Sequence, residues 1–165
     1  QNVTTKIARL FYKGAQKHDQ WPGENYEGTS VNGLMAFLKL KGWIGEYRWI
    51  YDIEELKRTL SWHGEVIVGS AWKEQCFRPD REGFIRFDGA SKGGHATCWC
   101  GINIEEGYFL IQQSWGRGHG IEGQVKMRFA DAEKLLRTGP QIAFPSKRII
   151  KSLTKISRPW WQFWK

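Results

Sequence analysis

The feature that most constrains the fold of this chain is a change of hydrophobic pattern near residue 64. Before this point apolar residues recur every three or four positions, as on one face of an α-helix, over residues 4–18, 28–42 and 52–63. After it, alternating segments rich in β-branched and aromatic residues lie between glycine-rich turns, at 65–72, 83–89, 95–104, 107–115 and 122–129. A short helix is predicted at 130–137. Helices first and strands afterwards predict an α+β fold with segregated halves.

Charge divides the chain into two parts. The net charge is +8, yet residues 1–133 carry 17 basic and 17 acidic side chains, whereas residues 134–165 carry eight basic ones and no acid. A nucleic-acid-binding domain usually spreads its basic residues over a folded face, so the whole chain does not fit that class. We therefore predict a body over residues 1–143 and a basic tail over residues 144–165.

The cysteine count points to a reducing compartment. Cys76, Cys98 and Cys100 are an odd number, in a chain long enough to bury a core without disulfides. Cys98 and Cys100 face the same side of one predicted strand, where buried free cysteine is ordinary core material. A metal site formed with His95 would need an H-x-x-C-x-C spacing that matches no familiar zinc motif, so we predict no metal. Cys76 is expected to pack rather than react.

A candidate catalytic pair lies on neighbouring predicted strands. His95 begins one strand after Gly93 and Gly94, and the next strand ends at Gln113. An amide oxygen that accepts the ring N–H of a histidine orients the imidazole and leaves its other nitrogen to deprotonate a nucleophile. An isolated histidine is more often structural, but the segments around this pair favour the catalytic interpretation.

These segments resemble a known family. GGHATCWCGI, which contains His95, and FLIQQSWGRGHGIEG, which contains Gln113, resemble the His and Asn regions of papain-like cysteine peptidases. EGTSVNGLMAFLKLKGWIGEYRW resembles a helix and its following segment in bacterial and phage relatives, so the likeness covers residues 4–143. It implies a helical half facing an antiparallel, barrel-like half, a peptide or protein substrate in the cleft between them, and no cofactor.

The resemblance also implies a role for each site residue. His95 takes the place of the catalytic histidine, Gln113 that of the orienting asparagine, and Trp115 that of the indole that shields the pair from water. Gln113 is one methylene longer than asparagine, so it reaches His95 only with a shifted backbone or a bent rotamer. His119 stands where relatives have an aromatic residue, and we expect it to pack or lie at the surface.

The nucleophile of the family has no counterpart here. In the family a cysteine opens a helix ahead of the segment that matches residues 7–17, whereas the first cysteine of this sequence is Cys76. We expect that cysteine in a segment upstream of Gln1. We also expect this segment, or another protein, to pack on the body, because an uncovered apolar trough is unfavourable.

The tail combines cations with tryptophans. Residues 146–156 can form a basic amphipathic helix, and the last eight residues read RPWWQFWK. We take Arg158, Trp160, Trp161 and Trp164 as docking residues, since Trp and Arg dominate interface hot spots. We rank docking on a protein, or packing on the body itself, ahead of an anionic membrane surface and of nucleic acid.

Two functions of different classes follow. The first is a cysteine peptidase that uses a Cys–His pair, in a reducing intracellular or phage-particle setting. The alternative is a catalytically inactive papain-like domain that serves as a structural or interaction component of a larger assembly, such as a phage particle. A nucleic-acid module that works through the tail alone is a third hypothesis, which predicts binding that weakens steeply with salt.

Overall fold

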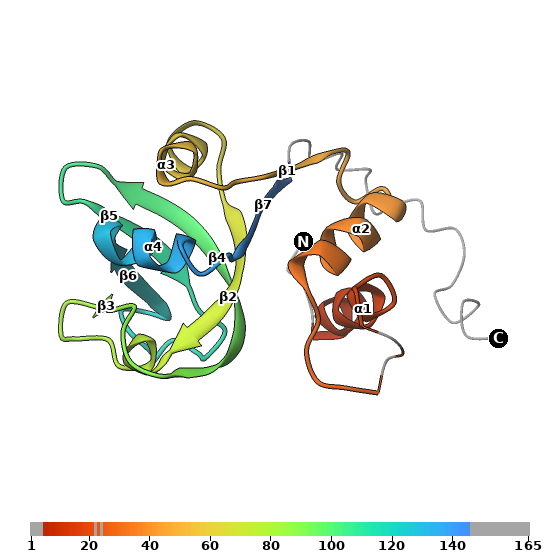
Figure 1. Ribbon diagram of the computed structural model, residues 1–165, viewed down its shortest axis with the longest axis horizontal. Helices are drawn as coiled ribbons and strands as arrows, with labels where there is room; N and C mark the ends of the chain where they lie inside the picture. The colour runs from red at the N-terminus through yellow and green to blue at the C-terminus, as the bar shows by residue number, and fades with distance from the viewer. Residues whose placement is uncertain (1–4, 22, 24, 146–165) are drawn as a thin grey trace.

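The computed structural model describes residues 5–21, 23 and 25–145, and these form four α-helices and a seven-stranded sheet (Figure 1). The α+β class predicted from the sequence is confirmed. In chain order the elements are α1 (Thr5–Gln16), α2 (Val31–Leu40), β1 (Tyr47–Trp49), α3 (Ile53–Trp62), β2 (Val66–Lys73), the 3-10 helix η1 (Glu74–Phe77), β3 (Phe84–Ile85), β4 (Ser91–Asn103), β5 (Tyr108–Gln112), β6 (Gln124–Arg128), α4 (Phe129–Leu136) and β7 (Gln141–Pro145).

The helices begin where the sequence places capping residues. At the start of α2 the Ser30 hydroxyl accepts a hydrogen bond from the Gly33 N–H over 3.0 Å. At the start of α3 an Asp52 carboxylate oxygen accepts the Glu55 N–H over 2.8 Å. Each cap satisfies one of the backbone donors that a helix leaves free in its first turn. No helix among the described residues is long and apolar enough to cross a membrane.

The sheet has the order β1-β7-β2-β4-β5-β6-β3, and its neighbours are antiparallel except for β3 and β6, which are parallel. β4 begins at Ser91, not at His95 as the sequence indicated. Gly93 and Gly94 resemble a turn in the sequence, but they pair with Trp72 and Ala71 of β2. His95 therefore lies within a strand whose residues before and after it pair with β2, and it is itself paired with Ser70.

The last described strand, β7, separates two apolar cores. Its neighbouring residues Ile142 and Ala143 are both fully buried, and successive side chains of a strand point to opposite faces. Ile142 belongs to the sheet core and Ala143 to the helix core, whose buried members are Val31, Met35, Phe37, Leu38, Ile44 and Ala143. β7 also continues to Pro145, across the boundary predicted between residues 143 and 144.

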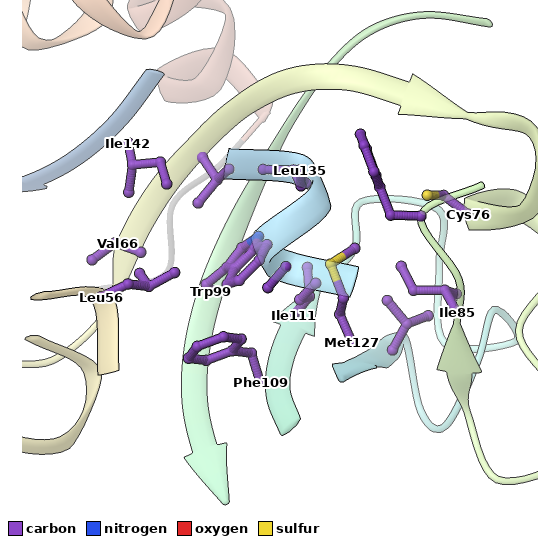
Figure 2. Packing of buried hydrophobic residues seen from close by; sticks show 14 of the residues in the cluster. Leu56, Val66, Cys76, Ile85, Trp99, Phe109, Ile111, Met127, Leu135 and Ile142 are labelled. Carbon is purple, nitrogen blue, oxygen red and sulfur yellow. The ribbon is translucent and has the colours of Figure 1, made fainter. Parts of the chain in front are cut away.

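The sheet core lies inside the curve of the sheet, beneath α4 (Figures 1 and 2). Trp99, Phe109 and Ile111 of the central strands are fully buried there. Helix α3 contributes Leu56 and Leu60 to this core. The helical half is therefore formed by α1 and α2 alone, and not by all of the first 63 residues as the order of patterns indicated.

Candidate functional site

His95 and Gln113 meet because β4 and β5 are antiparallel neighbours. Cys98 pairs with Gln112 across the two strands, so Gln113 follows directly at the end of β5 beside His95. His95 Nε2 lies 2.9 Å from Gln113 Oε1. An amide oxygen only accepts hydrogen bonds, so in this arrangement Nε2 carries the ring proton and Nδ1 keeps a free lone pair. The longer side chain of glutamine thus reaches the imidazole.

Two indoles enclose the imidazole of His95. Trp115 stacks on it, with ring centroids 4.6 Å apart and planes 12° apart. Trp72 of β2 contacts it edge-on at 5.0 Å. Trp72 is 1% exposed and Gln113 is 5% exposed, whereas Trp115 is 39% exposed and forms the outer wall. The His95–Gln113 hydrogen bond is therefore shielded from water, which strengthens it.

Two further aromatic residues hold Trp115 in place. Phe77 of η1 stacks on its indole with centroids 5.3 Å apart, and the ring of His119 lies perpendicular to it at 4.8 Å. His119 therefore has the packing role expected from the sequence. Trp72 and Phe77 were missed in the sequence, because they precede the His95 segment by about twenty residues and reach the site only through the register of β2 with β4.

The face of β4 that carries His95 is open two residues before it, at Gly93. A Cβ atom added at Gly93 would meet no atom within 4 Å. Because side chains at alternate positions of a strand share a face, this open space adjoins the imidazole of His95. It leaves room for a bulky group, such as a peptide, to approach the ring.

None of the three cysteines is placed to act with His95. His95 shares a face of β4 with the buried Thr97 and Trp99, so Cys98 lies on the other face. Cys100 stands where the register of β4 with β5 shifts, and its sulfur donates a hydrogen bond to the Leu110 carbonyl oxygen over 3.6 Å. Cys76 is fully buried, and its sulfur donates a hydrogen bond to the Arg86 carbonyl oxygen over 3.4 Å.

The surroundings of Cys76 and Cys100 raise the thiol pKa and so favour the neutral form. Burial raises the pKa of Cys76 to about 11 and also raises the pKa of Cys100 above its ordinary value. A nucleophilic cysteine needs the opposite environment, which stabilises the thiolate. Within the part of the chain that the structure describes, no group of three His, Cys, Asp or Glu side chains could hold a metal ion.

The two remaining histidines lie away from the site. His18 packs near Phe37, and His63 packs near Phe144 at the end of β7. The tail residues Arg158, Trp160, Trp161 and Trp164 fall outside the described residues, so docking of the tail stays a prediction.

Solved structures that align with this chain include cysteine proteases. One is the cysteine protease CMS1MS2 of Carica candamarcensis in complex with E-64, at a TM-score of 0.49 and 20% identity, over 64% of this chain and 50% of that one. Another is digestive procathepsin L 3 of the Tenebrio molitor larval midgut, at a TM-score of 0.46 and 16% identity, over 63% of this chain and 36% of that one. This chain thus spans half the length of the first and about a third of the second. No model of a protein family matches the sequence, and no curated protein matches it.

Proposed function

We propose that this chain carries the general base and the orienting amide of a papain-like cysteine peptidase. The observation that carries the proposal is the 2.9 Å hydrogen bond between His95 Nε2 and Gln113 Oε1 beneath the stacked indole of Trp115. A base held by one ring nitrogen, with the other nitrogen free, is the arrangement that nucleophilic catalysis by a thiol requires. The motif likeness around His95 and Gln113 supports the same function.

In the proposed reaction His95 Nδ1 takes the proton of a cysteine thiol. The thiolate attacks the carbonyl carbon of a peptide bond, and the imidazolium then donates its proton to the departing amine, so that an acyl-enzyme thioester remains. His95 next takes a proton from a water molecule as the water attacks the thioester. The imidazolium returns this proton to the departing thiolate, which releases the acid and restores the thiol. Gln113 accepts the Nε2–H throughout and keeps the imidazole from rotating.

The attacking thiol is proposed to belong to a cysteine that precedes residue 1 in the full-length protein. Cys98 faces away from His95 on β4, and burial disfavours the thiolates of Cys76 and Cys100. A fourth cysteine could approach His95 over Gly93, where an added Cβ atom would meet no atom within 4 Å.

Labelling of the full-length protein tests the proposal. A cysteine-directed epoxide or iodoacetamide should label one residue ahead of residue 1, as located by peptide mass spectrometry. His95→Ala should lower both the labelling rate and peptide turnover by about 10²–10⁴-fold, the usual contribution of a general base. His63→Ala is the matched control, because His63 contacts Phe144 away from the site, and it should leave both rates unchanged.

Normal turnover in His95→Ala would contradict the peptidase function. If the full-length protein has no cysteine ahead of residue 1 and cleaves no peptide, the catalytically inactive alternative replaces it.

A further inference from the structure

The site contains an unusual group of buried polar atoms. Among the described residues, four buried side-chain atoms have no hydrogen-bond partner: Ser70 Oγ, Trp72 Nε1, Gln113 Nε2 and His119 Nε2. All four surround His95. Ser70 is paired with His95 across β2 and β4, Trp72 contacts its ring, Gln113 bonds to it, and His119 contacts the indole stacked on it. Buried polar groups are almost always hydrogen-bonded, so such a concentration needs a physical cause.

The free end of the Gln113 amide decides which nitrogen of His95 is the base. Turned by 180°, the amide would present its NH₂ group to Nε2, and the ring proton would then have to sit on Nδ1. His95 could no longer accept a proton at Nδ1. The orientation with Oε1 toward His95 is therefore favoured only if the Nε2–H of Gln113 has a hydrogen-bond acceptor. That hydrogen bond must make this orientation more stable than the turned one.

Among the four atoms, Ser70 Oγ fits this requirement best. Trp72 Nε1 can only donate. His119 lies against the edge of Trp115, whose face covers His95. Ser70 belongs to the same face of β2 as Val68 and Trp72, directly opposite His95. The other hydroxyl on this side of the sheet, that of Thr97, already accepts the Trp99 Nε1–H over 3.1 Å and donates to the Val68 carbonyl oxygen over 3.4 Å.

We propose that Ser70 is a positioning residue that fixes the Gln113 amide through one buried water molecule. The water accepts the Nε2–H of Gln113 and the Nε1–H of Trp72 and donates to Ser70 Oγ, which gives it the three bonds typical of a buried water. Gln113 Oε1 is thereby held toward His95, and Nδ1 of His95 stays free. The importance of this tautomer for catalysis rests on the proposed peptidase function, but the water and the tautomer do not.

The tautomer of His95 is the decisive measurement. In the ¹⁵N-labelled protein, at a pH where the His95 imidazole is neutral, long-range ¹H–¹⁵N spectra should show its Nε2–H form in excess. Ser70→Ala should lower the ratio of the Nε2–H to the Nδ1–H form by about two- to tenfold, the effect of losing one hydrogen bond. Ser70→Thr, which keeps the hydroxyl, should retain the wild-type ratio. His119→Phe, which removes Nε2 of His119 but keeps a ring against Trp115, should also retain it.

An unchanged ratio in a folded Ser70→Ala protein, or a ratio that falls only in His119→Phe, would overturn the proposal. A second measurement uses the wild type and so does not depend on how the variants fold. A crystal structure at high resolution should show a water within hydrogen-bonding distance of Gln113 Nε2 and Ser70 Oγ; a protein carbonyl bonded to Nε2 in its place would also overturn it. Neither result depends on the upstream cysteine, so an inactive protein with the predicted tautomer would contradict the peptidase function alone.

Discussion

Cys76 lies in η1 with no exposed surface, and its sulfur donates to the Arg86 carbonyl oxygen. Burial raises its pKa from the ordinary 9.0 to about 11, so between these pH values the unfolded chain loses a proton that the folded chain keeps. The Cys76 thiol therefore makes its full contribution to the free energy of unfolding below about pH 9, and this contribution is lost as the pH rises toward 11.

We predict that the free energy of unfolding falls between about pH 9 and about pH 11 by up to about 3 kcal/mol because of Cys76. Urea titrations over this pH range measure the fall. Other groups titrate there as well, so the comparison is with Cys76→Ala, in which the fall should be smaller by that amount. Parallel curves for the two proteins would mean that the Cys76 thiolate is not disfavoured in the folded state.

The core of the candidate site was predictable because consecutive antiparallel strands place their residues side by side. His95 and Gln113 lie 18 positions apart, across one hairpin, so strand patterns and a turn suffice to bring them together. Trp72 and Ser70 were not predictable. They depend on the register of β2 with β4, which joins strands separated by η1 and β3, and a shift of one residue would turn both side chains to the other face.

At the scale of elements, helix α2 packs closely against the sheet at Gly69 of β2. A Cβ atom at this position would lie 2.7 Å from Val31 Cγ2 at the start of α2. Valine is β-branched and has little rotamer freedom in a helix, so it cannot turn away without cost. This contact explains why β2 carries a glycine, which strands otherwise disfavour.

We predict that Gly69→Ala lowers the free energy of unfolding by about 1–3 kcal/mol, the usual cost of overpacking. Gly94→Ala is the matched control: it lies in the neighbouring strand, and its new methyl group would meet no atom within 4 Å. Denaturant unfolding of the two variants beside the wild type measures the difference. Equal effects of the two substitutions would show that α2 does not pack tightly on β2.

The shortest strands cannot be recognised from the hydrophobic pattern of the sequence. β1 spans three residues and β7 five, too few for alternation to stand out from a loop. The sequence also does not show that α3 packs on the sheet core, because its apolar residues Leu56 and Leu60 have the same spacing as the apolar residues of α2. Periodicity predicts that a helix has a buried face, but not which core receives it.

At the scale of the whole molecule, the described residues already bring together two apolar cores. Residues 146–165 carry six basic and no acidic side chains. If the tail docks on a partner, the body should be stable without it. If it packs on the body, its removal would expose apolar surface.

We predict that a chain truncated after Pro145 keeps its fold, with a thermal midpoint within about 4 °C of the full chain, which corresponds to about 1 kcal/mol for a protein of this size. Circular dichroism during heating provides the measurement. A larger fall would contradict docking on a partner and favour packing of the tail on the body.

The place of β7 in the sheet also has a consequence for folding on the ribosome. This strand is the last of those described, yet it lies between β1 and β2 and is the link by which β1 joins the sheet. Contacts between the two ends of a chain form slowly, since a long loop must close first. During synthesis, neither apolar core can be completed until residues 141–145 have left the exit tunnel, so we expect shorter nascent chains to expose apolar surface of both cores.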